Sequence, residues 1–485
     1  MDNISSTDYC AVIIVGAGIA GLAAANTLAS NGIHFIIVEA QDNVGGRVKT
    51  IVSSDNIAVD LGAQFVHGEK NNKVYELCTT LDCLVDDEDE SDEFFLTSKH
   101  KQVDSELAKE VWDIREKVLD KARKVKNTKK LFGDFLRENY QKEMLSTVDD
   151  ADTRQAFVQW LLKIEVEDNG CQSLNDINLT EFGVFETLDG DYMRPLKNSF
   201  QPFLDYLLSM IPTNQLRLNS EVTKVEYLAN KHLSIIEVID RVNGCSKKLS
   251  CDHIIWTTSI GHLKDNFSQI FGTENKLIEQ KQSAIENFGF GTVNKVVLIY
   301  PTPMNFWPNN VAGIYLLELP SAPVKLSRDQ LSFLATHEVD PQKAQCIMDA
   351  IVYVCPSAAF RTVSFSIAGQ AALFVEEMSE MVLCRLCHGI LCHYLEITNE
   401  DKNQPICALK SEWGKNRFIR GSYSFLSIRS TEQDQQCLRE PYAPDGVPRV
   451  IFAGEAMHPR FFSTIHGAFE SGSDAAHSLI KTKKT

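Results

Sequence analysis

The sequence lacks long hydrophobic runs and has no excess of basic residues. None of its apolar stretches approaches the length that a helix needs to cross a bilayer, so we expect no membrane-spanning segment. The first nine residues lack the basic and apolar regions of a secretory leader, so we expect no secretion. The 48 Lys and Arg residues face 65 Asp and Glu residues, and the net charge of -17 disfavours nucleic acid and anionic membranes as partners. The same charge favours the approach of small cations.

The cysteines form no pattern typical of disulfides or metal sites. Their number, 13, is odd and they are scattered, which indicates reduced thiols and a cytoplasmic protein, with a nuclear fraction as the alternative. Residues 481–485 do not form a peroxisomal signal. Cys and His residues gather in a predicted helix over 381–395, but a zinc site usually draws ligands from a second element. Cysteine is also a small apolar core residue, so we predict no metal site.

A strand–helix–strand pattern with a glycine-rich turn occupies residues 10–39. The β-branched run 12–15 predicts a buried parallel strand. Apolar residues over 19–31 fit one face of a helix, and 35–38 predicts the next strand. Glu39 stands at the end of that second strand, where nucleotide-binding units of this kind carry an acid. The sequence therefore predicts an α/β protein with a Rossmann-type unit at its start.

Each glycine of the turn has its own physical reason. Gly16 allows the tight turn, Gly18 lets the backbone approach a pyrophosphate, and Gly21 lets helix and strand pack closely. The helix N-terminus offers N–H groups and a partial positive charge to the phosphates. Glu39 can accept hydrogen bonds from ribose hydroxyls, and its charge argues against a 2′-phosphate. The unit by itself fits NAD or FAD, and a nucleotide-free α/β unit is the alternative.

Further stretches resemble the flavin-containing amine oxidase family, polyamine oxidase branch, and are closest to the animal spermine oxidases. They are residues 44–47, 60–68, 288–300, 413–424 and 450–467. The resemblance covers nearly the whole chain, with departures at Lys197 and Asn198, where the family has a glycine-rich turn, and at three aromatic positions. Phe65 stands where the family usually has Trp, and Phe461 and Phe462 stand where members often have Tyr. These departures leave a non-catalytic FAD-binding protein as one alternative.

The resemblance implies that FAD is the cofactor and that it is bound without a covalent link. In the monoamine oxidase branch a cysteine forms a thioether to FAD, and Ser422, which stands at its place, cannot form that bond. By the same resemblance, the residues expected to bind FAD are Gly16, Gly18, Gly21, Glu39, Arg47, Gly62, Ala63, Val222, Trp413, Gly454, Glu455, Thr464 and Ile465.

The resemblance also assigns five residues to the reaction site. Lys295 matches a lysine that holds a water against flavin N5, although a lysine beside an apolar run is normally a surface residue. His67 matches a histidine near the substrate, where it would position the substrate or handle protons, and Tyr423 matches an aromatic wall facing the flavin. Ser463 offers a polar contact, and Thr464 replaces a second caging Tyr of the monoamine oxidases. The resulting slot is open and polar, as suits a long amine.

The implied fold is that of the flavin amine oxidases. Its FAD-binding Rossmann-type domain is assembled from three segments, and its substrate domain has a mixed β-sheet flanked by helices. The length of 485 residues agrees with more than one domain. We expect the FAD-binding domain to comprise residues 1–70, 211–265 and 405–485, and the substrate domain 71–210 and 266–404.

The implied activity is that of a polyamine oxidase. A neutral spermine-like amine loses a hydride to flavin N5, the imine hydrolyses to an aminoaldehyde and a shorter amine, and O2 reoxidises the flavin and gives hydrogen peroxide. The expected partners are thus a polyamine and O2, and the sequence predicts no oligomeric state. An N-acetylpolyamine oxidase would share these motifs. A flavin histone demethylase is disfavoured because the chain has no room for chromatin-binding modules.

The remaining segments have simpler patterns. The acidic run 86–93 is typical of a solvated loop, with a mouth that attracts polycations as the alternative. Residues 104–130 predict a surface helix, and 131–139 and 156–164 predict two further amphipathic helices. Residues 216–242 predict a meander of short strands.

Overall fold

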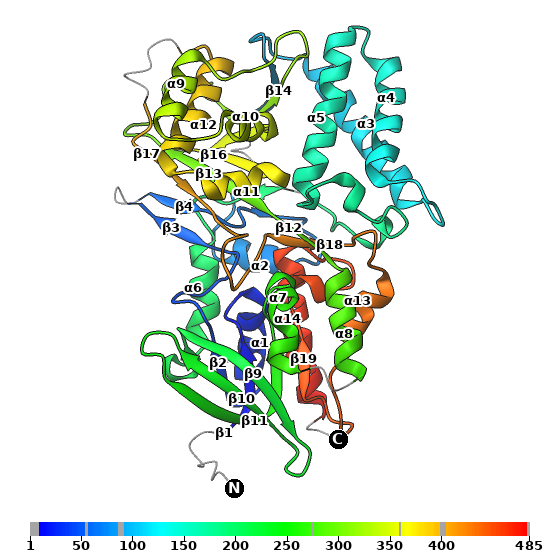
Figure 1. The fold of residues 1–485 in the computed structure, drawn as a ribbon, viewed down its shortest axis with the longest axis vertical. Helices are drawn as coiled ribbons and strands as arrows, with labels where there is room; N and C mark the ends of the chain where they lie inside the picture. Colours follow the sequence, from blue (N-terminus) through cyan, green and yellow to red (C-terminus); the bar gives the residue numbers. More distant parts are fainter. Residues whose placement is uncertain are drawn as a thin grey trace.

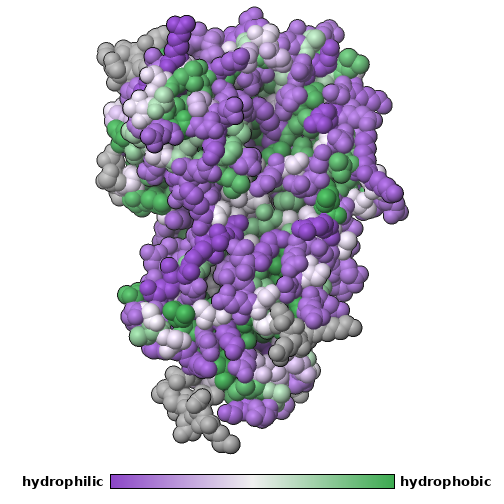
Figure 2. Space-filling model, in the orientation of Figure 1, coloured by the Kyte–Doolittle hydropathy of each residue, from purple (hydrophilic) through white to green (hydrophobic). Residues whose placement is uncertain are grey.

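The protein has two lobes, each built on one large β-sheet (Figure 1). The computed structural model describes residues 9–53, 57–85, 92–191, 193–272, 276–357, 360–397 and 404–482. In Figure 1 the sheet that contains both β1 and β11 lies in the lower half, and the sheet that contains β13 and β16 lies in the upper half. No helix in these ranges is long and apolar enough to cross a membrane. Figure 2 shows mainly hydrophilic side chains on the face in view, broken by small hydrophobic patches.

The lower sheet has seven strands that come from three separated stretches of the chain. Its order is β8-β2-β1-β11-β10-β9, and β19 also pairs with β11. The strands are β1 (Tyr9–Val15), β2 (Phe35–Val38), β8 (Leu216–Arg217), β9 (Ser220–Leu228), β10 (Leu233–Asp240), β11 (Ser246–Trp256) and β19 (Val450–Phe452). The predicted order of strand, helix and strand at the start of the chain is confirmed. The predicted meander is wrong in one respect, because β8 pairs in parallel with β2 instead of joining β9.

Both faces of strand β1 are buried, as its β-branched run predicted. Val12 and Ile14 belong to a cluster with α1 (Ile19–Ser30), whereas Ile13 and Val15 belong to the cluster on the other face. Helix α1 packs closely on α14 (Ile465–Thr482), where a Cβ on Gly472 would lie 2.0 Å from the Ala20 carbonyl oxygen. The opposite face is covered by α7 (Ile260–Phe271), α8 (Lys276–Asn287) and α13 (Glu432–Arg439).

The upper sheet is mixed, with the order β17-β13-β16-β15-β14-β6, in which β14 and β6 are parallel. Its strands are β6 (Asp92–Thr97), β13 (Val293–Ile299), β14 (Val311–Leu317), β15 (Tyr353–Pro356), β16 (Thr362–Ala368) and β17 (Cys407–Lys410). Helices pack on both faces of this lobe; they are α3 (Ser105–Arg123), α4 (Phe132–Thr147), α5 (Ala151–Asn169), α9 (Arg328–Thr336), α10 (Pro341–Ala350), α11 (Gly369–Glu377) and α12 (Glu380–Tyr394). The substrate domain was expected to have this mixed sheet with flanking helices.

Two helices from the range 71–210 pack with the lower sheet. Residues of α2 (Lys73–Thr80) and α6 (Gln201–Ser209) join α1 and α14 in one core cluster. Helix α8, from the range 266–404, contacts α7 and α13 on the other face of the same sheet. We therefore propose that the boundaries between the two domains fall after α2, before α6 and after α8.

The helix predicted over 104–130 is α3, and it lies at the surface with one face buried. That face includes Val111, Arg115 and Val118, and the helix packs against α4. Of the acidic run, residues 86–91 lie outside the described residues. At the end of the run, Glu93 lies in strand β6 and not in a loop. It accepts hydrogen bonds of 2.5 Å from both the Tyr315 and Tyr353 hydroxyls.

Candidate active site

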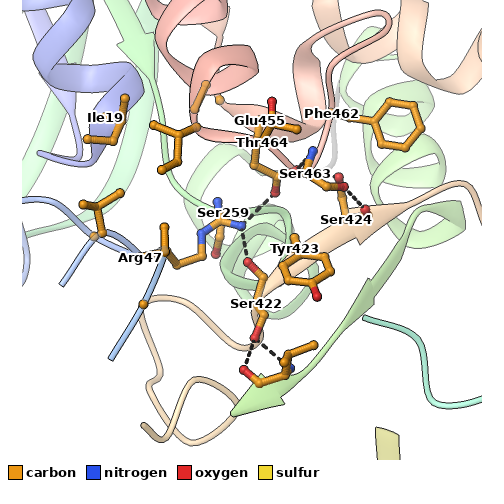
Figure 3. Close-up of a pocket in the computed structure, with 18 of the residues that line it drawn as sticks. Ile19, Arg47, Ser259, Ser422, Tyr423, Ser424, Glu455, Phe462, Ser463 and Thr464 are labelled. Carbon is orange, nitrogen blue, oxygen red and sulfur yellow. Dashed lines mark hydrogen bonds and ion pairs between the residues drawn. The ribbon is translucent and has the colours of Figure 1, made fainter. Parts of the chain in front are cut away.

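A cavity of about 800 Å³ lies between the two sheets and reaches from the glycine-rich turn to strand β13. It brings together nearly all of the residues that the sequence singled out. The predicted residues that line it are Gly16, Gly18, Glu39, Arg47, Gly62, Ala63, His67, Val222, Lys295, Trp413, Tyr423, Gly454, Glu455, Ser463, Thr464 and Ile465. Gly21 is absent from the lining, because it packs inside the lower lobe. Figure 3 shows part of the wall, with side chains from distant parts of the sequence facing one another.

The glycine-rich turn has the geometry of a phosphate cradle. Gly16 has a φ of +105°, and its N–H donates to the Val38 carbonyl at 2.8 Å. A Cβ on Gly21 would lie 2.0 Å from the Gly16 carbonyl oxygen, whereas a Cβ on Gly18 would meet nothing within 4 Å. Gly18 is also the N-cap of α1 and provides no side-chain cap for the first N–H groups. The open space at Gly18 and these N–H groups fit a pyrophosphate.

Glu39 is held rigidly at the edge of the cavity. Its carboxylate accepts hydrogen bonds from the backbone N–H of Ala17 at 2.7 Å and of Gln41 at 2.8 Å. Burial raises the pKa of Glu39, and these N–H groups oppose that rise by favouring the charged form. Each of its oxygens keeps further acceptor capacity, which suits the hydroxyls of a ribose.

Arg47 and Glu455 form an ion pair in the middle of the cavity wall. Arg47 Nη1 lies 2.8 Å from Glu455 Oε1 and 2.7 Å from the Ser422 carbonyl oxygen (Figure 3). The other oxygen of Glu455 accepts from the Ser424 hydroxyl at 2.6 Å and from the Ser463 N–H at 2.9 Å. Glu455 thereby joins the second glycine stretch to two loops near the end of the chain.

Strand alternation places Lys295 on the cavity side of β13. Val296 and Leu298 point into the cluster with α12, so Lys295 shares the opposite face with Val297 and Ile299. Its Nζ donates to the Gly62 carbonyl oxygen and Gln64 Oε1, both at 2.6 Å, and to the Asp60 carbonyl oxygen at 3.2 Å.

Burial lowers the pKa of Lys295 to about 8, a shift that the charge of Asp60 opposes. In the neutral form, two N–H groups of Lys295 can satisfy the two short bonds, to Gly62 and Gln64, and the lone pair is then open to a hydrogen bond from water. Loss of a proton from Lys295 would release the longest of its three contacts, the one to the Asp60 carbonyl oxygen.

Tyr423 reaches the cavity through a short pairing between β12 (Gly289–Gly291) and β18 (Tyr423–Phe425). Its hydroxyl donates to the Glu167 carbonyl oxygen at 2.5 Å. The ring lies against Gly170, whose φ of +62° ends helix α5, and a Cβ there would lie 2.5 Å from the ring. This contact fixes the aromatic wall to the end of α5.

The hydroxyl protons of Ser463 and Thr464 are used within their own loop. Ser463 has a φ of +68° and donates to the Ser424 carbonyl oxygen. Thr464 donates to the Phe461 carbonyl oxygen at 2.7 Å and accepts from the Gly467 N–H at 2.9 Å. The two side chains line the cavity, where their oxygens can offer acceptors.

His67 faces a small group of histidines at one end of the cavity. Burial and the nearby rings of His67 and His458 lower the pKa of His466 to about 3, so its ring is neutral. His458 stacks on Phe461 with ring centroids 4.8 Å apart, whereas Phe462 lines the cavity itself. Of the three aromatic departures, Phe65 and Phe462 therefore lie in the cavity wall, and Phe461 does not.

Sequence reasoning missed several residues of the cavity. Gln64 was within a quoted stretch and could have been found there; Glu167, Cys355 and Ser366 carried no motif. Glu167 comes just after the predicted helix 156–164, and the structure extends that helix to Asn169. Ser366 is the direct cross-strand partner of Lys295, a relation that only the pairing of β13 with β16 creates.

In the helix rich in Cys and His, α12, His388 contacts other side chains of the protein. His388 Nδ1 lies 3.0 Å from the Tyr300 hydroxyl, and its Nε2 lies 3.4 Å from Cys392 Sγ. Burial lowers the pKa of His388 to about 4. Among the described residues, no group of three or more His, Cys, Asp or Glu could hold a metal ion. No disulfide links the 13 cysteines, all of which lie within the described ranges.

The fold and the cavity define a flavoprotein of the amine oxidoreductase class. Residues 19–480 match the model of the family described as flavin containing amine oxidoreductase, and the chain belongs to this family. It is an enzyme, and its cofactor is FAD. Ser422 donates its hydroxyl to the Val293 carbonyl at 2.7 Å and has no sulfur, so this position cannot form a thioether to FAD.

Its relatives include several oxidases of amines. The chain is 26% identical to the peroxisomal N(1)-acetyl-spermine/spermidine oxidase of Bos taurus, with 97% of this chain and 94% of that protein covered. It is 24% identical to polyamine oxidase 1 of Oryza sativa subsp. japonica, with 97% of each covered. A solved structure of a putrescine oxidase double mutant has the same fold, with a TM-score of 0.64, 16% identity, and coverage of 98% of this chain and 99% of that one.

Proposed function

We propose that this protein oxidises spermine-like polyamines. The observation that carries the proposal is the acidic arm of the cavity beyond Lys295. The carboxylates that line this arm are Glu116, Glu165, Glu167, Asp168 and Glu181. They outnumber its two arginines, Arg115 and Arg123, which are already engaged in ion pairs with Glu116, Glu165 and Asp168. A long polycation can leave its remote ammonium groups in this arm while one amine reaches Lys295.

The chain's own residues would bind and orient the amine. Bound FAD would supply the acceptor for the hydride that leaves the carbon next to the amine nitrogen. Tyr423, fixed by its hydrogen bond to α5, would form a wall that sets the direction from which the amine carbon approaches. Lys295 would hold a water beside the reacting atoms, through the lone pair of its neutral form. His67 would position the substrate, and Ser463 and Thr464 would offer acceptors to its N–H groups.

Acetylated polyamines are the second candidate substrates. Two of the relatives are named as N(1)-acetyl-spermine/spermidine oxidases, and an acetyl group removes one positive charge from the substrate. The acidic arm favours the unacetylated form, because an acetylated substrate has one ammonium group fewer to be attracted by these carboxylates. An interaction protein that binds FAD without catalysis is a third candidate, and the presence of Lys295 in the cavity argues against it.

The test is anaerobic reduction of the bound flavin. The purified holoenzyme is mixed with spermine, spermidine or an N-acetylated form without oxygen, and the visible flavin band is followed. We expect the band to bleach most rapidly with spermine and hydrogen peroxide to form when oxygen returns. Faster bleaching by an acetylated amine would assign the second candidate. Retention of FAD with no bleaching by any of these amines would contradict polyamine oxidation.

The cytoplasm is the proposed location, on the basis of the odd and scattered cysteines. The relatives from Bos taurus and Homo sapiens are named as peroxisomal, so imaging of a tagged full-length chain against a peroxisomal marker is the direct check.

A further inference from the structure

Glu167 occupies a position in the cavity that the reaction described above leaves unused. It lies in the last turn of α5, three residues before the left-handed Gly170, and its side chain lines the cavity. Its backbone carbonyl holds the Tyr423 hydroxyl at 2.5 Å. The same residue therefore anchors the aromatic wall with its backbone and presents a carboxyl group to the cavity.

The carboxyl group of Glu167 is next to the Lys295 site. The Ser366 hydroxyl hydrogen-bonds to it, and Ser366 is the cross-strand partner of Lys295 in the β13–β16 ladder. The charged and titratable groups that face this region from the neighbouring elements are Asp168 of α5, Arg115 of α3, Lys295 of β13, Tyr353 and Cys355 of β15, and Tyr423 of β18. Among them, Lys295 favours the ionised carboxylate, whereas Asp168 disfavours it.

We propose that Glu167 is the base that takes the proton from the incoming substrate ammonium. This inference rests on the amine oxidation proposed above. In this step an N–H bond of the ammonium breaks, and its electron pair stays on nitrogen. An O–H bond forms on the Glu167 carboxylate, so the amine becomes neutral and the buried carboxylate loses its charge. Neutralising the two opposite charges together removes both desolvation costs at once.

The other groups in the cavity are less suited to this role. Lys295 donates to three acceptors when protonated, and in its neutral form its lone pair is the group that would hold the water. Asp168 is paired with Arg115, and Glu455 is paired with Arg47, so each would have to leave an arginine when it became neutral. Glu167 has a serine hydroxyl as its hydrogen-bond donor, which can also accept from a protonated carboxyl. Burial raises the pKa of Glu167 from 4.5 to about 7. The gap between this pKa and that of an amine is therefore smaller than it is for an ordinary carboxyl group.

The experiment measures flavin reduction as a function of pH in the holoenzyme. In the natural protein, kcat/KM should rise with pH through about 7, as Glu167 ionises. In Glu167→Gln this rise should disappear, and kcat/KM at pH 7.5 should fall by roughly 100-fold. Activity should return only at high pH, where the free amine is already neutral. Glu167→Asp keeps a carboxyl group and should restore part of the rise.

Ser366 and Ser364 provide a matched pair of variants on strand β16. Ser366→Ala removes the hydroxyl that stabilises the ionised carboxylate, so the rise of kcat/KM should move to higher pH. Ser364→Ala removes a hydroxyl two residues away on the same cavity wall and should leave the rise in place. Equal shifts in the two serine variants, or an unchanged rise in Glu167→Gln, would overturn the assignment.

A second readout needs no turnover. Infrared difference spectra of the holoenzyme, recorded as the pH is lowered through 7 without amine, should show a protonated carboxyl that is missing in Glu167→Gln. With the flavin chemically reduced beforehand, spermine binding at pH 8 should also produce this carboxyl. Binding without it would overturn the proposal. Absence of spermine binding, together with a carboxyl that titrates near pH 7, would instead contradict the polyamine substrate and leave a buried base for another amine.

Discussion

Arg47 and Glu455, which are 408 positions apart in the sequence, meet at 2.8 Å in the cavity wall. Their side chains are 26% and 5% exposed, so the pair is largely withdrawn from solvent. Two further donors, the Ser424 hydroxyl and the Ser463 N–H, saturate the same carboxylate. Because Glu455 joins the first and last parts of the chain, its charge matters for the shape of the cavity and not only for the local pair.

The first prediction concerns this ion pair. Glu455→Gln leaves the Arg47 guanidinium without its counter-charge, and we expect a loss of about 2–3 kcal/mol in the free energy of unfolding. FAD should also dissociate more readily, as measured by retention of flavin on dialysis. Glu377→Gln breaks the exposed pair with Lys343 and is the control, with an expected change within about 1 kcal/mol. Equal effects of the two variants on flavin retention would contradict a special role for Glu455.

The second prediction separates two glycines of the same turn. A methyl group at Gly18 meets no protein atom within 4 Å, so Gly18→Ala should fold normally and weaken FAD binding by about 1–3 kcal/mol as the methyl enters the phosphate space. A methyl group at Gly21 lies 2.0 Å from a carbonyl oxygen, so Gly21→Ala should destabilise the apoprotein by about 3 kcal/mol. Thermal unfolding of the apoproteins and titration with FAD distinguish the two effects. If the phosphates of FAD bind elsewhere in the cavity, Gly18→Ala should leave the FAD affinity unchanged.

The third prediction uses two lysines with similar chemistry and different places. Lys295 and Lys281 each donate to three oxygen acceptors, and burial lowers the pKa of both to about 8. Lys281 is 1% exposed and holds the carbonyls at the end of α13, outside the cavity. Lys295→Met should slow flavin reduction by roughly 100-fold and Lys281→Met should lower the melting temperature without slowing reduction. Unchanged reduction in Lys295→Met would refute its role in the reaction.

The fourth prediction is a pH dependence of stability. The pKa of Glu167 rises from 4.5 to about 7 on folding, so the folded state binds this proton more tightly than the unfolded state. Its contribution is fully present below pH 4.5 and is lost as the pH rises through 7. Gln cannot titrate, so its free energy of unfolding lacks this loss. From pH 5 to pH 8, the free energy of unfolding of Glu167→Gln should rise by on the order of 2 kcal/mol relative to that of the natural protein. Denaturant unfolding at both pH values measures this difference, and a pH-independent difference would show that Glu167 ionises normally.

The local patterns near the start of the chain were predictable because they depend on neighbours in the sequence. The buried run of β1, the glycine turn and the acid at position 39 all follow from strand and helix periodicity within one unit. The position of Lys295 on the cavity side follows from alternation along β13, once the strand is recognised. The helix over 381–395 was also predicted correctly, because its apolar spacing is local.

Pairings between distant segments were not predictable in the same way. Helices α2 and α6 pack on the lower sheet because their apolar faces complete the core around α1, which their own sequences do not reveal. The parallel pairing of β8 with β2 depends on a crossover of the intervening chain, and so defeated a prediction based on adjacent short strands. Periodicity identifies an apolar face, but it does not identify what that face will pack against.

The sequence by itself determined the nucleotide-binding unit, the family and most of the predicted residues that line the cavity, because each of these is carried by a short motif. Only the tertiary structure decided which buried groups share the reaction site. It brought Glu167 beside Ser366 and Tyr423 through the end of α5. The physical reason is that the environment of a charge is set by all the elements packed around it, whereas a motif records only its neighbours along the chain.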